Sequence, residues 1–151
     1  FKVGSSYFQF AESSRRITYG EGIGYEAEVN VHVWKGLDVW IGSSYFYKSE
    51  GASRIKIFPF GAGFKYRLSS GMLNFYAGAG ANYYKYEEST PTLSESQGEV
   101  GYVAKVGSFI RVMRVFIVDL HLHYSYCYLT LTSQRVNIGG AEAGIAIGYA
   151  F

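Results

Sequence analysis

Bulky apolar side chains alternate with small or charged ones along most of this 151-residue chain. The clearest stretch runs from Glu21 to Trp34, where every second residue from Ile23 to Val33 is apolar or aromatic. Such a period of two indicates β-strands. Similar segments lie at residues 37–45, 60–68, 73–82, 100–111, 116–126 and 143–151, and a fainter one at about 2–12. The pattern therefore predicts eight strands.

The face opposite the bulky one mixes glycine and alanine with charged side chains. A soluble sandwich does the reverse, because it packs its bulky face inside and leaves polar residues to solvent. An eight-stranded barrel has an interior just wide enough for side chains to fill, so small residues would leave room there for Lys, Arg and Glu. The bulky face would then point into lipid. The predicted fold class is all-β: a single domain, residues 1–151, forming an eight-stranded antiparallel up-and-down transmembrane β-barrel.

Short and long connections alternate along the chain. The short ones are residues 34–37, 69–72 and 112–115, and the longer polar ones are 12–20, 48–53, 87–98 and 129–137. Transmembrane barrels have short periplasmic turns and longer extracellular loops. We therefore expect the bacterial outer membrane, with both termini in the periplasm. Loop 87–98 is acidic, polar and proline-bearing, which predicts a mobile surface segment.

Aromatic residues gather near the predicted strand ends, as expected for two belts at the level of the lipid head groups. On the long-loop side they are Tyr45, Tyr47, Tyr83, Tyr84, Tyr86, Tyr124, Tyr126 and Tyr128, and on the short-turn side Trp34, Phe64, Tyr66, Phe75, Phe116, Tyr149 and Phe151. Pro59 removes one ladder donor, and the apolar phase shifts there from Ile55 and Ile57 to Phe60. We therefore predict a β-bulge at Phe58–Pro59.

Composition agrees with a barrel and excludes several other classes. The chain is 48% hydrophobic, yet its mean hydropathy is only +0.01. No run approaches the roughly 18 apolar residues of a membrane helix. The net charge is +2 without a polybasic run, so no nucleic-acid partner is predicted. No leader segment precedes the first strand, which suggests a mature sequence. No cofactor is predicted.

The charged residues of the small-residue face form the strongest constellation in the sequence. Buried charges persist only when they are paired and hydrogen-bonded, and five acids here face four bases. We predict a salt-bridge network that plugs the lumen. Its members are Glu26, Glu28, Asp38, Asp119 and Glu142, with Lys65, Arg67, Lys105 and Arg111.

The last seven residues, IAIGYAF, resemble the terminal strand of bacterial outer-membrane proteins through Ile145, Ile147, Tyr149 and Phe151. The segments GAGFKYRL (61–68) and FYAGAGANYY (75–84) resemble strands of the small OmpX-like, OmpA-like and opacity-type barrels. This resemblance implies that the barrel-assembly machinery reads the terminal strand. It also implies contact with outer-membrane lipid and lipopolysaccharide, and a surface ligand or a larger membrane complex as partner.

A weaker resemblance suggests an enzyme. His123 and Ser125, together with Glu142 on the next strand, are similar to the catalytic triad of the outer-membrane lipid A 3-O-deacylase, in which a serine cleaves an acyl ester. That triad faces lipid. Here the alternation places His123, Ser125 and Glu142 on the lumen face, which favours packing over catalysis unless a bulge near Tyr124 reverses the facing.

Three histidines raise the question of a metal site. His121 and His123 are two apart on one strand and project to the same side, and Asp119 or Glu142 could add a ligand. Zinc sites usually need three or four ligands in closed geometry. We therefore interpret His32, His121 and His123 as hydrogen-bonded lumen residues and predict no metal.

The function predicted from sequence is a structural or surface-interaction, adhesin-like barrel that is not an open pore. Two alternatives stay open: a lipid A-modifying ester hydrolase that uses His123, Ser125 and Glu142, and an accessory subunit of a larger outer-membrane complex.

Overall fold

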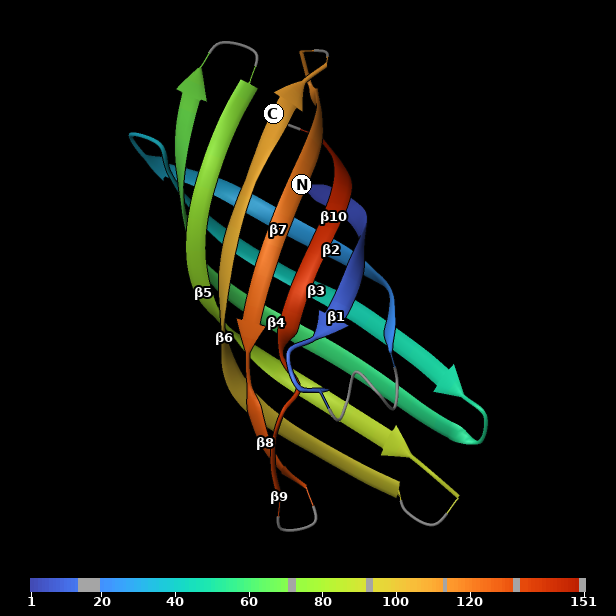
Figure 1. Cartoon of the computed structure of the whole chain (residues 1–151). Coiled ribbons are helices and arrows are strands. Elements are labelled where there is room, and N and C mark those ends of the chain that lie inside the picture. Colours follow the sequence, from blue (N-terminus) through green and yellow to red (C-terminus); the bar gives the residue numbers. More distant parts are fainter. Residues whose placement is uncertain (14–19, 71–72, 92–93, 113, 132–133, 150–151) are drawn as a thin grey trace.

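A computed structural model describes residues 1–13, 20–70, 73–91, 94–112, 114–131 and 134–149 (Figure 1). Eight strands form a closed barrel: β1 (Lys2–Phe10), β2 (Glu21–Trp34), β3 (Leu37–Glu50), β4 (Ser53–Ser70), β5 (Leu73–Ser89), β6 (Ser94–Arg111), β7 (Phe116–Tyr126) and β10 (Gly140–Tyr149). A separate two-stranded sheet consists of β8 (Tyr128–Leu131) and β9 (Gln134–Asn137). Among the described residues, no helix is long and apolar enough to cross a bilayer.

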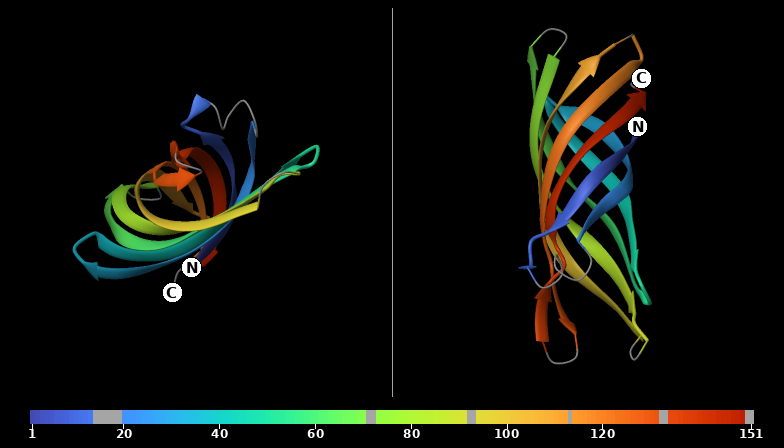
Figure 2. Two further views of the ribbon diagram at one scale, coloured as in Figure 1. Left: turned by 90° about the horizontal axis from the view of Figure 1, so that it is seen from below. Right: turned by 45° about the vertical axis from the view of Figure 1, so that its right-hand side comes forward.

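The barrel closes where the first strand meets the last. The order around the barrel is β1-β10-β7-β6-β5-β4-β3-β2, and all neighbouring strands are antiparallel. Both termini lie at one end of the barrel together with the short connections (Figures 1 and 2). There β2 joins β3 through Lys35 and Gly36, whose positive φ angles of 33° and 86° suit a tight hairpin turn. The predicted eight-stranded antiparallel fold is confirmed.

The outer face of the barrel is apolar, and the inner face is not. Val29, Leu120 and Ile147 are 47%, 50% and 61% exposed, whereas the Lys65 side chain is 4% exposed. A closed barrel with apolar residues on its outer face and charged residues in its lumen is the arrangement expected in a membrane. The inside-out assignment made from the alternation therefore holds.

Small residues make room for large inward side chains, as the alternation suggested. Trp40 on β3 is paired with Gly63 on β4, which is paired in turn with Gly80 on β5. The indole is buried over these two glycines, and a Cβ on Gly63 would lie 2.8 Å from Trp40 Nε1. The ammonium of Lys105 covers the indole ring 3.7 Å from its centroid.

The half of the lumen far from the termini is filled by an apolar plug. Its members come from β1, β3, β4, β5 and the segment 127–138: Phe8, Phe10, Phe46, Ile55, Ile57, Tyr84, Tyr86, Cys127, Leu129, Val136 and Ile138. Phe8, Phe10 and Phe46 make edge or tilted ring contacts at 4.9–5.7 Å. The placement of Tyr84 and Tyr86 in an outer aromatic belt was therefore wrong, because both point inward into this plug.

The plug also explains the phase change at Pro59. The register between β4 and its neighbours is unshifted across Phe58–Pro59, so the predicted bulge is absent there. Ile55 and Ile57 have the same parity as the lumen residue Lys65 and are buried, whereas Phe58 and Phe60 are exposed. The apolar phase shifts because apolar side chains fill the lumen at this level, not because the strand is irregular.

Strands replace much of the predicted long loops. The β3–β4 hairpin is paired out to Glu50 and Ser53, and the β5–β6 hairpin is paired out to Ser89 and Ser94. Residues 129–137 contain most of the β8–β9 hairpin. The paired residues of the predicted connections 48–53 and 87–98 are therefore strand rather than loop. Of loop 12–20 and turns 69–72 and 112–115, residues 14–19, 71–72 and 113 lie outside the described residues.

The described residues that were predicted to act as an assembly signal lie on the outer face of the terminal strand. Ile145, Ile147 and Tyr149 are exposed toward the lipid side, and Tyr149 packs edge-on against Phe116 at 5.8 Å. Phe151 lies outside the described residues.

Candidate functional site

A buried ionic cluster occupies the middle of the lumen. Glu28 of β2 accepts hydrogen bonds from Lys65 of β4 and from Lys105 of β6, the latter at 2.7 Å. Lys2 of β1 lies 3.5 Å from the same carboxylate. All four side chains are at most 9% exposed. One carboxylate thus lies within 3.5 Å of three ammonium groups, which come from three other strands, β1, β4 and β6.

Lys2 extends the cluster toward the termini. Its Nζ donates a 2.6 Å hydrogen bond to Asp119 of β7 and lies 3.7 Å from Glu26. The Tyr76 hydroxyl donates to both oxygens of Asp119, at 3.0 and 3.2 Å. Sequence reasoning missed Lys2 because the first strand shows only a faint alternation. Its position two residues before Gly4, in phase with Ser6 and Phe8, was the available signal.

A second ionic group lies near the mouth at the termini. Arg67 of β4 is 3.4 Å from Asp38 of β3, and His32 Nδ1 is 2.8 Å from the same carboxylate oxygen. Arg111 is exposed and lines a cavity of about 450 Å³ at this mouth, together with Asp38 and Arg67. The structure thus brings eight of the nine predicted network residues into buried or partly buried positions in the lumen and leaves Arg111 at its edge.

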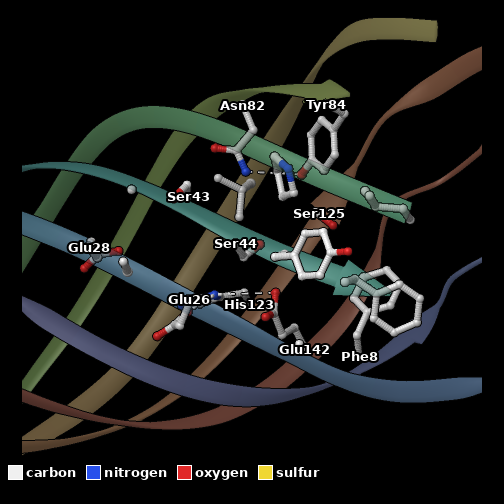
Figure 3. A pocket seen from close by; sticks show the side chains of 18 of the residues that line it. Phe8, Glu26, Glu28, Ser43, Ser44, Asn82, Tyr84, His123, Ser125 and Glu142 are labelled. Carbon is white, nitrogen blue, oxygen red and sulfur yellow. Dashed lines mark hydrogen bonds and ion pairs between the residues drawn. The ribbon is translucent and has the colours of Figure 1, made fainter. Parts of the chain in front are cut away.

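Glu142 stands apart from the lysines. Ser6 donates a hydrogen bond to its Oε1, and its Oε2 is 3.9 Å from His123 Nδ1. Glu142 lines a small cavity of about 50 Å³ with Glu26, His123 and Ser125 (Figure 3). This cavity lies between the ionic cluster and the apolar plug, and both Trp40 and Phe46 line it.

The three residues of the suggested triad meet around this cavity without forming a catalytic relay. Ser125 Oγ exchanges hydrogen bonds with the backbone of Gly140, at 3.3 Å to its carbonyl oxygen and 3.1 Å from its N–H. His123 is buried and its ring stacks on His121 at 4.4 Å. Within the described chain no hydrogen bond joins His123 to Ser125, so the serine has no base in reach.

Comparisons with known proteins agree with the architecture. No family model and no curated protein matches the sequence. Among solved structures, Neisserial surface protein A is similar with a TM-score of 0.78 at 14% identity, covering 99% of this chain and 95% of that one. Ail, the attachment invasion locus protein of Yersinia pestis, gives 0.61 at 17% identity over 99% and 95% of the two chains. The outer membrane enzyme PagL gives 0.56 at 13% identity over 100% of both.

The chain has the fold of the small outer-membrane β-barrels. At such identities the likeness establishes the fold, and the roles of the matched proteins do not follow from it.

In a barrel of this fold, acyl chains contact the outer face, where neither Ser125 nor His123 presents its polar atoms. Tyr124 and Leu122 occupy that face of β7 instead and are 53% and 58% exposed. No bulge reverses the facing, because β7 pairs with β10 in one continuous register from Phe116 to Tyr124. The site buries several charged side chains, and the Ser125 hydroxyl faces the lumen rather than the lipid.

We expect Ser125→Ala to leave the lipid A of the host bacterium unchanged. Among the described residues, the hydroxyl contacts the backbone of Gly140 and the Tyr84 side chain, so we expect its loss to remove a packing contact and no catalytic group. Mass spectrometry of lipid A from cells expressing the parent, the variant or an empty vector would check this. Deacylated lipid A produced by the parent and abolished by Ser125→Ala would contradict the inward-facing arrangement.

Proposed function

We propose that this chain is a surface-interaction barrel of the bacterial outer membrane, with a closed lumen and a protruding sheet that contacts its partner. One observation carries the proposal: the lumen is filled at two successive levels, while four strands continue beyond the plugged end. A molecule built in this way has no path for solute and a large rigid surface outside the membrane.

The closed lumen supports the exclusion of a pore. The ionic cluster around Glu28 fills one level and the apolar plug around Phe46 fills the next. Eight strands leave an interior that side chains can fill completely. We expect planar-bilayer recordings of the refolded protein to show no steady open channels. Large, stable conductance steps would contradict this part of the proposal.

The protruding sheet supports a role in contact. Strands β3 to β6 extend past the rest of the barrel at the end far from the termini (Figures 1 and 2). Among the described residues, β6 pairs only with β5 over residues 94–101, and β3 pairs only with β4 over 47–50. Unpaired strand edges present backbone groups to which a partner strand can add. A rigid sheet with open edges therefore suits a protein partner.

The charges of this sheet argue against a strongly anionic ligand. Lys56 and Lys85 both lie near Glu87, at 4.0 and 2.9 Å, so basic and acidic side chains are interleaved. Ail, the structural relative named as an attachment protein, has also been solved with the heparin analogue sucrose octasulfate. A sulfated glycan needs a surplus of positive charge, which the interleaved charges of this sheet do not supply.

The difference between the two ends of the barrel, short turns at one and the protruding sheet at the other, supports one orientation in the membrane. We place the termini and short turns in the periplasm and the protruding sheet outside, with lipopolysaccharide around the outer half of the apolar face. The outward residues Ile145, Ile147 and Tyr149 of the last strand are the part that we propose the barrel-assembly machinery recognises.

Shortening the β5–β6 hairpin tests the contact role. Replacing residues 88–95 with Asn-Gly would join Glu87 to Ser96, which are already paired, through a favourable two-residue turn. We expect bacteria that express this variant to adhere to epithelial monolayers no better than cells with an empty vector, because the protruding edge is lost. The altered gel mobility of the unheated protein would show that the barrel still folds.

A matched control keeps the backbone and changes only side chains. Lys85→Ala with Glu87→Ala removes an exposed ion pair on the same hairpin and should retain adhesion if the strand edge is recognised. Full adhesion by the shortened barrel, or parent adhesion equal to that of the vector, would refute the proposed function.

A further inference from the structure

Two histidines and a glutamate converge inside the barrel. His121 and His123 of β7 and Glu26 of β2 are all buried, and one ligand atom from each lies within 4.8 Å of the other two. The imidazole rings are stacked with an interplanar angle of 16°. Residues two apart on a strand point to the same side, which brings both rings to the wall that faces Glu26.

Several polar atoms of this group have no hydrogen-bond partner among the described residues. They are Glu26 Oε1, both ring nitrogens of His121 and His123 Nε2. The sequence-based interpretation of these histidines as hydrogen-bonded lumen residues is therefore not met for three of their four nitrogens. A buried polar atom left unpaired is destabilising, so this group favours a ligand that satisfies several atoms together.

The spacing suits a small cation. Ligand atoms bound tetrahedrally at about 2.0–2.1 Å, as in zinc sites, lie about 3.3 Å apart. Glu26 Oε1 is 3.4 Å from His121 Nε2, and Glu26 Oε2 is 3.8 Å from His123 Nδ1. Glu142 is a fourth candidate ligand, since its Oε2 is 3.9 Å from His123 Nδ1. The candidate ligand atoms lie within 4.8 Å of one another, and the two stacked rings would have to rotate for their nitrogens to converge on one ion.

The numbers of acidic and basic side chains in the central cluster also favour an added cation. The central cluster contains the carboxylates of Glu26, Glu28, Asp119 and Glu142 against the ammonium groups of Lys2, Lys65 and Lys105. At formal charges and with neutral imidazoles, these groups carry four negative and three positive charges. Lys2 is drawn to Asp119 at 2.6 Å, whereas its distance to Glu26 is 3.7 Å, which leaves Glu26 available to a second cation.

We infer that Glu26, His121 and His123 form a binding site for a divalent transition-metal ion of the zinc type, with Glu142 as the additional ligand. The site spans the closure of the barrel, because β1 and β10 lie between β2 and β7. A bound ion would therefore clamp the seam between the first and last strands. The adjoining cavity of about 50 Å³ offers room for a water on the ion.

Binding of Zn²⁺ and Co²⁺ to the refolded, chelator-treated chain in detergent tests the site. Titration calorimetry should give one Zn²⁺ per barrel, and Co²⁺ should give the intense visible absorption of tetrahedral nitrogen and oxygen coordination. His121→Gln and His123→Gln should each weaken Zn²⁺ binding at least about 10-fold, the effect commonly seen even for groups that only support metal ligands.

His32→Gln is the matched control, since His32 lies near the mouth beside Asp38 and outside the site. Its Zn²⁺ affinity should equal that of the parent. Absence of saturable binding by the parent, or binding lost only in the His32 variant, would overturn the inference and assign the unpaired nitrogens to internal water. Should the histidine variants fail to fold, the stoichiometry and Co²⁺ spectrum of the parent decide the question alone.

Discussion

Replacing Glu28 with alanine is expected to destabilise the barrel by about 3–5 kcal/mol, the range found when one partner of a buried ion pair is removed. Glu28 is the only carboxylate of the described cluster that binds Lys65 and Lys105, and it also lies 3.5 Å from Lys2. Its loss leaves ammonium groups buried without their main acceptor. The free energy of unfolding in urea, followed in phospholipid vesicles by tryptophan fluorescence, measures the effect.

Glu87→Ala provides the comparison on the protruding sheet. Glu87 is exposed, and the hydrogen bond from Lys85 lowers the pKa of its carboxyl group and raises the pKa of the lysine. Solvent screens such a pair, so this variant should unfold at the same urea concentration as the parent. Equal stability of the Glu28 and Glu87 variants would show that the central cluster does not hold the barrel together.

A double variant separates loss of the pair from loss of the acid alone. Lys65→Met removes an ammonium group that Glu28→Ala leaves unpaired, and both side chains are buried in contact. Coupled neighbours have effects that do not add. The double variant should therefore be more stable than the sum of the two single losses predicts, and strict additivity would contradict a direct ionic contact.

The inside and outside of the barrel could be predicted because the strands alternate between inward and outward residues over most of their length, with one register shift at the end of β2 between His32 and Trp34. Parity alone placed Leu120 outside and Asp119 inside, and it also set the inward facing of His123. Hydrogen bonding between strands fixes this period, so local sequence carries the information. The alternation also gave the number of strands, and the short turns between them predicted that neighbouring strands are antiparallel.

Alternation does not reveal what fills the lumen at each height. Ile55 and Tyr86 are both inward-facing and buried. From sequence, the apolar phase at Ile55 was interpreted as the sign of a bulge, and Tyr86 was interpreted as part of an outer aromatic belt. The partner of an inward residue lies on another strand of the barrel, at a sequence distance that no local pattern records. Lys2 and Asp119 illustrate this, since they are bonded although 117 residues apart.

The length of the outer hairpins could not be predicted for a different reason. Beyond the apolar belt both faces of β5 and β6 are polar, as at the paired residues Glu87 and Ser96. Without a buried face the period-two signal disappears, although backbone pairing continues. The sequence therefore suggested a loop where the strands extend.

Trp40→Ala is expected to be the second severe change, with a loss of about 3–5 kcal/mol, as is typical when a buried large aromatic side chain is truncated. The indole fills the space above Gly63 and Gly80, where a Cβ on Gly63 would lie 2.8 Å from its Nε1 and a Cβ on Gly80 would meet its Cζ2. The change also removes the ring beneath the Lys105 ammonium group at 3.7 Å, a cation–π contact worth about 2 kcal/mol when desolvated. Trp40→Phe should cost much less, because it keeps a ring there and removes an indole N–H that has no partner among the described residues.

Trp34, the other tryptophan of the chain, provides a matched control because it is 65% exposed on the outer face. Trp34→Ala leaves no cavity in the lumen and should destabilise the barrel far less than Trp40→Ala. The single-tryptophan variants add a test of position: brominated lipids should quench Trp34 in the Trp40→Phe protein but not Trp40 in the Trp34→Phe protein. Quenching of both residues to the same extent would mean that Trp40 faces lipid, and the lumen packing described above would then be wrong.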